Sequence, residues 1–149
     1  MLAKILQVMV HAGHETLWNL LLDRLHHPER YLQEVSEARI VKETDDLIVR
    51  ELKLHGNLVK ERISINPYAG ELRHELLEHP QFTGIIVARI LPTARQSPVA
   101  PHYLEYELEL QRKSFQLEGL VKAEEEIVAE FETEMHQLKS RAEEMDSRK

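Results

Sequence analysis

Two charged residues near the middle of the sequence stand where apolar residues are expected. The stretch LIVRELKLHGNLVKERISI, residues 47–65, reads as a hairpin with a two-residue turn at Gly56-Asn57. Side chains alternate between the two faces of a strand, so Arg50 and Glu61 fall on the leucine and isoleucine face. A guanidinium is a permanent, forked donor suited to a carboxylate or enolate, and a glutamate can act as general acid or base. The pair predicts ligand binding or acid–base chemistry.

This turn also predicts the register of the hairpin. Arg50 then lies opposite Ile63 and diagonal to Glu61, and such diagonal positions are about 7–8 Å apart. On the outer face, Glu51 is expected opposite Arg62 as an exposed ion pair. Desolvation makes a buried ion pair a poor source of stability, and that cost falls where water or a polar ligand group is present. The inner pair therefore favours a cavity lining, while a structural position or one at the rim of the sheet stays open.

Other polar side chains fall on apolar faces in the same way. His74 alternates with leucines in ELRHELLEH, Tyr106 does so in HYLEYELEL, and Glu124 lies in the apolar stripe of a C-terminal helix. Each is more often structural than functional when taken alone, but together they suit an apolar pocket with a few polar anchors. The predicted cavity lining is Arg50, Leu52, Glu61, Ile63, His74, Tyr106, Leu108, Glu124 and Phe131, with Glu61 and His74 as candidates for catalysis.

The sequence contains no recognisable motif for a metal, a cofactor or a nucleophile. HELLEH, residues 74–79, departs from the H-E-x-x-H pattern of zinc proteases, and its two histidines point to opposite faces of a strand. There are no cysteines, and the five glycines form no phosphate-binding loop. We therefore predict neither a metal site nor a cofactor.

Composition limits the class of protein. A chain of 149 residues with 42% apolar residues is expected to form one domain with a sizeable core. The net charge of -7 argues against nucleic acid as a partner, and no apolar run is long enough to span a membrane. MLAKILQVMV reads as a first strand rather than a signal peptide, so a cytoplasmic protein is predicted. The oligomeric state stays open, with a homodimer among the alternatives.

Periodicity predicts the order of elements. A first strand at 4–12 is followed by a helical segment that Pro28 divides into two short helices. A long amphipathic helix over 114–142 closes a single domain, 1–142, and a polar tail follows at 143–149. The remaining strands are predicted at 35–43, 47–54, 58–66, 71–78, 82–91 and 103–112.

These elements predict an α+β fold. Strands joined by tight turns form an antiparallel meander, and one face of such a sheet needs cover. Only the C-terminal helix is long enough to provide it. A curved sheet of about seven strands wrapped on this helix would leave a concave space, where ligand pockets tend to form.

This order resembles the START/SRPBCC helix-grip superfamily, and within it most closely the AtaL-like group of small microbial proteins. The resemblance covers essentially the whole chain. It is carried by HETLWNLLLDRLHHPERYL, LIVRELKLHGNLVKERISINP and the final helix from Phe115. It implies a cavity between sheet and helix that holds a small hydrophobic or amphipathic molecule. Members include lipid carriers, receptors, cyclases and aromatases, so the fold does not choose the activity.

The sequence leaves three functions open. The first is a non-enzymatic protein that binds a small hydrophobic ligand, with Arg50, Glu61, His74 and Tyr106 orienting its polar end. The second is a polyketide cyclase, aromatase or dehydratase-like enzyme that uses the same cavity. The third is a protein-interaction module with a filled cavity. A Glu61 that is fully paired favours binding, and an unpaired Glu61 or His74 with a shifted pKa favours catalysis.

Overall fold

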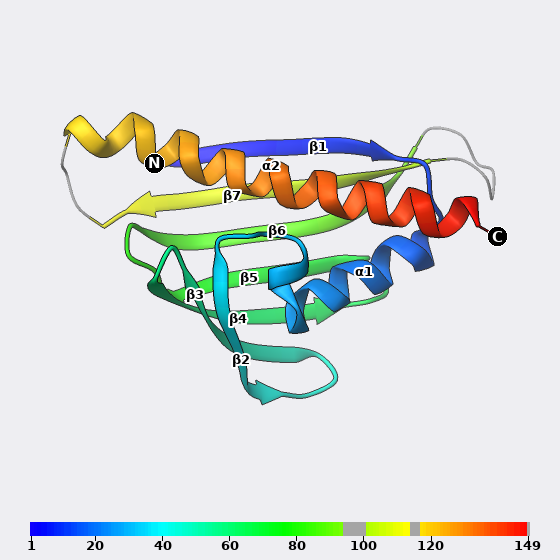
Figure 1. Cartoon of the computed structure of the whole chain (residues 1–149), viewed down its shortest axis with the longest axis horizontal. Coiled ribbons are helices and arrows are strands. Elements are labelled where there is room, and N and C mark those ends of the chain that lie inside the picture. Colours follow the sequence, from blue (N-terminus) through cyan, green and yellow to red (C-terminus); the bar gives the residue numbers. More distant parts are fainter. Residues whose placement is uncertain (94–100, 114–116, 149) are drawn as a thin grey trace.

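The computed structural model describes residues 1–93, 101–113 and 117–148. One strand and one helix precede a run of six strands, and a second, much longer helix follows them (Figure 1). The elements are β1 (Leu2–Val10), α1 (His14–His26), the 3-10 turn η1 (Pro28–Arg30), β2 (Val35–Glu43), β3 (Leu47–Leu54), β4 (Asn57–Asn66), β5 (Glu71–Glu78), β6 (Phe82–Pro92), β7 (His102–Arg112) and α2 (Leu117–Ser147).

All seven strands form one antiparallel sheet in the order β1-β7-β6-β5-β4-β3-β2. The last strand returns to pair with the first, with Leu6 of β1 opposite Tyr106 of β7. Both helices lie against the sheet, and α2 runs along β1 and β7 while its C-terminal half meets α1 (Figure 1). This is the predicted α+β helix-grip arrangement.

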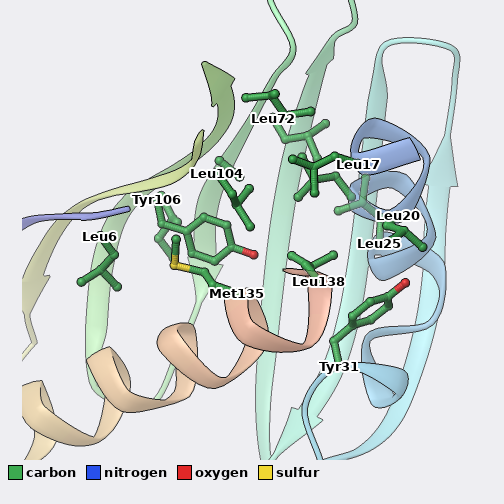
Figure 2. Close-up of a cluster of buried hydrophobic side chains, with 14 of the residues drawn as sticks. Leu6, Leu17, Leu20, Leu25, Tyr31, Leu72, Leu104, Tyr106, Met135 and Leu138 are labelled. Atoms are coloured by element: carbon green, nitrogen blue, oxygen red, sulfur yellow. The ribbon is translucent and has the colours of Figure 1, made fainter. Parts of the chain in front are cut away.

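The core lies between the concave face of the sheet and the two helices (Figure 2). Strand alternation determines which side chains enter it: the even-numbered residues 104–110 of β7 are all fully buried, as predicted. From α1, Leu17 and Leu25 point into the same cluster as Leu138 of α2. The period of two therefore predicts which side chains of each strand point into the core.

The turn and register of the central hairpin differ from the prediction. His55 and Gly56 form the turn, both with positive φ (51° and 78°), and Leu54 pairs with Asn57. Positive φ at both central positions is typical of a type I′ turn, which histidine tolerates better than most residues. Arg50 consequently lies directly opposite Glu61. The register differs by two residues, an even number, so every side chain keeps its predicted face.

The outer face and the helices also differ in detail. Glu51 lies opposite Lys60 and pairs with Arg39, whereas Arg62 pairs with Glu75. Helix α1 is a single helix of thirteen residues, and Pro28 begins only a 3-10 turn. The prediction of a second short helix was therefore wrong.

The long helix α2 continues beyond the predicted end at residue 142. It extends through Ser147 because Asp146 accepts hydrogen bonds from the Gly13 N–H and the Thr16 hydroxyl, both at 2.6 Å. These bonds fix the polar end of α2 to the start of α1. The predicted start of the helix, 114–116, lies outside the described residues.

Candidate functional site

Two adjoining chambers lie between the sheet and the helices. The inner cavity has a volume of about 60 Å³. A larger outer chamber, the vestibule, has a volume of about 510 Å³ and shares Leu54, His79, Ile127 and Glu130 with it. The inner cavity is lined by Arg24, Pro28, Leu32, Val35, Arg50, Leu52, Leu54, Val59, Glu61, His74, Leu76, His79, Ile86, Ile127, Glu130, Phe131 and Glu134.

The structure brings five of the nine predicted lining residues to this cavity. They are Arg50, Leu52, Glu61, His74 and Phe131. The other four are placed elsewhere: Ile63 and Leu108 are fully buried in the core, Tyr106 lies behind the cavity, and Glu124 is a partly exposed residue of α2 that lines neither chamber.

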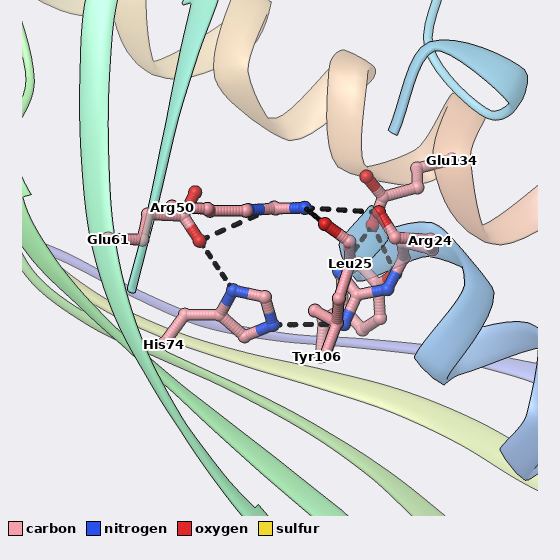
Figure 3. A network of polar contacts seen from close by, with 7 residues as sticks. All are labelled: Arg24, Leu25, Arg50, Glu61, His74, Tyr106 and Glu134. Atoms are coloured by element: carbon pink, nitrogen blue, oxygen red, sulfur yellow. Dashed lines mark hydrogen bonds and ion pairs between the residues drawn. The ribbon is translucent and has the colours of Figure 1, made fainter. Parts of the chain in front are cut away.

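A continuous polar network forms one side of the inner cavity (Figure 3). The Tyr106 hydroxyl donates a short hydrogen bond to Glu134 Oε1. The same oxygen accepts from Arg24 Nη1 at 3.0 Å. Arg24 also lies over the Tyr106 ring, 5.5 Å from its centroid. Strand β7, helix α1 and helix α2 are thus joined through one buried carboxylate.

His74 continues the network in a defined tautomer. Arg24 Nη2 lies 2.9 Å from His74 Nε2, and a guanidinium only donates, so Nε2 must accept. The proton is therefore on Nδ1, which donates to Glu61 Oε2 at 2.6 Å. Both ring nitrogens of His74 are occupied.

Arg50 completes the network from strand β3. Its Nη1 donates to the carbonyl oxygens of Arg24 and Leu25, at 3.0 and 3.1 Å, near the C-terminal end of α1. A cation there also interacts favourably with the helix dipole. Its Nη2 donates to Glu61 Oε2 at 3.4 Å. Arg50 is thereby used to hold α1 against the sheet, which leaves no forked donor pair for a ligand carboxylate.

Electrostatics reinforces this arrangement. Burial alone would raise the pKa of Glu61, but Arg50, His74 and Arg24 together bring it well below its usual range. Burial is the main cause that lowers the pKa of His74, and with the help of the two arginines it outweighs the raising effect of Glu61. Burial raises the pKa of Tyr106, so its hydroxyl stays protonated. Two guanidinium groups face two carboxylates, and the network is electrically balanced.

Sequence reasoning missed four polar lining residues: Arg24, Glu134, His79 and Glu130. Arg24 and Glu134 are 3% and 7% exposed although both belong to helices with a polar face. Their positions offered a signal, since Arg24 lies three residues after Leu21 in the α1 stripe, and Glu134 lies four residues before Leu138. A charged residue within the apolar stripe of a helix indicates a buried charge.

His79 lies at the junction of the two chambers. Its Nδ1 accepts hydrogen bonds from the backbone N–H groups of Gln81 and Phe82, at 3.0 and 3.1 Å. Burial lowers the pKa of His79, so the ring is neutral and carries its proton on Nε2. No described residue accepts that proton. His79 Nε2–H is thus an available donor at the junction.

The vestibule has an acidic rim. Glu34, Glu126 and Glu130 line it together with His55 from the β3–β4 turn. His55 Nε2 forms a short ion pair with Glu130, and this hydrogen bond raises the pKa of His55. The pair connects the hairpin to α2 across the vestibule.

Neither a metal cluster nor a spanning helix is present in the part of the chain that the structure describes. No group of three or more His, Asp or Glu side chains there could hold a metal ion. Within the same residues, no helix is long and apolar enough to cross a membrane.

Comparisons with known proteins identify the fold. No protein-family model and no curated protein matches the sequence. The Zhui aromatase/cyclase from Streptomyces sp. R1128 matches with a TM-score of 0.71 and 16% identity, over 99% of this chain and 94% of that one. A START superfamily protein from Mycobacterium smegmatis matches with a TM-score of 0.71 and 16% identity, over 96% and 98% of the two chains.

The di-domain ARO/CYC StfQ from the steffimycin biosynthetic pathway also matches, with a TM-score of 0.79 and 14% identity. The match covers 96% of this chain and 51% of StfQ. At these identities the likeness concerns the fold alone, and the chain has the predicted helix-grip fold. Assignment to the AtaL-like group stays a prediction.

Proposed function

We propose that the chain binds one small amphipathic molecule and catalyses no reaction. The apolar body of the ligand lies against the apolar lining of the inner cavity and against the apolar minority of the vestibule lining, which is Leu54, Pro80, Ile127 and Ala129. Its polar end meets the network of Glu61, His74, Arg24 and Glu134. The vestibule, at about 510 Å³, falls in the size range of small-molecule pockets, about 300–1,000 Å³.

The pairing of Glu61 and His74 is the observation that carries this proposal. Glu61 accepts from both Arg50 and His74, and each nitrogen of His74 has a partner. A general base must be free to reach the proton that it removes. His74 could take a proton only by breaking a buried hydrogen bond, and the lowered pKa of Glu61 makes its carboxylate a weak base, so the network is suited to orienting a ligand.

The enzyme alternative is supported by the likeness to two aromatase/cyclase proteins, Zhui and StfQ. It needs Glu61 or His74 as acid or base, and the occupied nitrogens of His74 and the lowered pKa of Glu61 argue against it. The interaction-module alternative needs a filled cavity, and the two chambers argue against that. Binding is therefore the function that the site supports best.

Titration with the uncharged dye Nile red tests the proposal. A Leu54→Trp variant places a larger side chain where the two chambers meet. We expect the wild type to bind about one dye per chain, and Leu54→Trp to bind at least about tenfold more weakly because the added ring occupies ligand space.

Leu58→Trp is the matched control, because Leu58 belongs to the same hairpin, is exposed and lines neither chamber. It should bind as the wild type does. Equal binding by Leu54→Trp would mean that the dye is held elsewhere, and would refute the proposed location.

A further inference from the structure

Two carboxylate oxygens of the inner cavity have no hydrogen-bond partner among the described residues. Every bond from those residues to Glu61 ends on Oε2, and every such bond to Glu134 ends on Oε1. Glu61 Oε1 and Glu134 Oε2 are left over, although the two residues are only 8% and 7% exposed and both line the cavity. A carboxylate oxygen only accepts hydrogen bonds. The cavity therefore offers unfilled acceptors.

The donors around the inner cavity are partly committed. Each Nη atom of Arg24 and of Arg50 makes at least one hydrogen bond, as does the Nδ1–H of His74. The Nε atoms of the two arginines have no partner, but protein atoms enclose them and a ligand cannot reach them without displacing the network. His79 Nε2–H is a further donor without an acceptor among the described residues, and His79 lies at the junction with the vestibule.

Charge disfavours an anionic ligand at every step of entry. The vestibule is lined by Glu34, Glu126 and Glu130, and His55 is the one cationic partner among its described lining residues. Inside, two arginines balance two glutamates, so a further charge would be buried without compensation. Burying an uncompensated charge is far more costly than burying a hydroxyl that finds an acceptor.

We propose that the inner cavity selects an uncharged ligand through a hydroxyl group, which donates to Glu61 Oε1 or Glu134 Oε2. This inference rests on the proposed binding function and names the class of ligand. The small inner cavity, about 60 Å³, suits a group of a few atoms, and the apolar body of the ligand stays in the vestibule. It replaces the sequence-based expectation that Arg50 would anchor a carboxylate or enolate.

Three probes of one shape test the inference by isothermal titration calorimetry: 2-naphthalenemethanol, its methyl ether and 2-naphthoate. The alcohol can donate, the ether can only accept, and the naphthoate is anionic. We expect the alcohol to bind about tenfold or more tightly than the ether, because only the alcohol can fill an acceptor of a buried carboxylate. The naphthoate should bind most weakly.

Glutamine variants identify the accepting oxygen. Glu61→Gln and Glu134→Gln each present an amide N–H₂ in place of a carboxylate oxygen. In the variant that replaces the accepting residue, the alcohol and the ether should bind with about equal affinity. Glu132→Gln, an exposed position on the same helix, is the matched control and should keep the tenfold preference. Thermal unfolding of each variant checks that it folds.

The outcomes separate the inference from the binding proposal. Naphthoate binding as tightly as the alcohol, or equal binding of alcohol and ether to the wild type, would overturn the hydroxyl inference and leave binding intact. Preservation of the alcohol preference in both Glu61→Gln and Glu134→Gln would overturn it as well. Absence of binding by all three probes and by Nile red would overturn the binding proposal itself.

Discussion

Two ion networks occupy opposite faces of the same sheet and differ in what surrounds them. On the convex face, Arg89 donates to Glu71, Glu105 and Glu107 at 3.1, 2.7 and 2.8 Å. The Arg89 side chain remains 22% exposed, whereas that of Arg24 on the concave face is 4% exposed. Similar chemical groups are therefore placed in a partly solvated network, in which Glu105 is itself buried, and in a dry one.

The contrast shows why only one of these networks suits a binding site. Exposed pairs are screened by water and salt, and each contributes about 0–1 kcal/mol. Buried groups must be satisfied by specific partners, so their hydrogen bonds have fixed directions and any unfilled acceptor becomes a specific feature. The outer network stabilises three neighbouring strands, and the inner network defines the chemistry of a cavity.

The two networks should differ most in the stability that is lost when the central arginine of each is replaced. Arg24→Met leaves Glu134 with one donor fewer and His74 Nε2 with no donor, so the free energy of unfolding should fall by about 3–5 kcal/mol. Arg89→Met should lower it by about 1 kcal/mol. Urea denaturation followed by circular dichroism measures both. Equal losses would remove the distinction between the two networks.

Acid should act mainly through the inner network. The folded-state pKa of Glu61 is lowered, so its contribution is complete above the unfolded value near 4.5 and is lost as the pH falls below it. His74 also has a lowered pKa, so the unfolded chain takes up its proton first and stability begins to fall below pH 6.5. The guanidinium of Arg89 stays charged throughout.

Urea denaturation between pH 7 and pH 3 measures this dependence. Glu61→Gln should lose on the order of 2 kcal/mol less than the wild type over that range, because it has no carboxylate to titrate. A variant that retains the full acid sensitivity would show that the loss arises elsewhere.

A smaller effect is expected from removing one hydroxyl. Tyr106→Phe deletes the donor to Glu134 in the dry network and should lower the free energy of unfolding by about 1–2 kcal/mol. Tyr31→Phe deletes a 2.7 Å bond to Asp23, which is partly exposed and also paired with Arg30, and should lower it by about 0.5–1 kcal/mol. Thermal and urea unfolding compare the two. The reverse order would contradict the proposed difference in surroundings.

Salt should change the stability loss of the two arginine variants only slightly, but in only one of them. Raising NaCl from about 0.1 M to about 1 M shortens the Debye length from about 10 Å to about 3 Å. The stability loss in Arg89→Met should then shrink by a few tenths of a kcal/mol, while the loss in Arg24→Met should stay unchanged. An equal response to salt in both variants would indicate that solvent reaches the inner network too.

Much of the fold was predictable because it depends on periodic patterns. Alternation placed Arg50, Glu61, His74 and Tyr106 on the concave face, and the even register shift preserved those faces. The turn was not predictable in detail. The glycine-first pair Gly56-Asn57 is better suited to a two-residue turn, but His55 and Gly56 form it and His55 adopts a positive φ. That difference alone changed Arg50 and Glu61 from diagonal neighbours to direct partners.

The site was only half predictable, because its geometry depends on contacts far apart in sequence. Arg24 meets Glu134 across 110 positions, and no local pattern reports such a pairing. The bonds of Arg50 to α1 were missed for the same reason, since the carbonyl oxygens that accept from its Nη1 belong to a distant helix. Helix stripes indicate which residues are buried, but they do not identify the partners of a buried charge.

Native mass spectrometry of the purified chain, with and without added 2-naphthalenemethanol, tests ligand binding most directly. We predict a mass excess of one small molecule per chain, either carried through purification or acquired from the added alcohol, which is lost on denaturation and is absent in Leu54→Trp. A native mass equal to that of the bare chain under both conditions would contradict a binding role for the cavity.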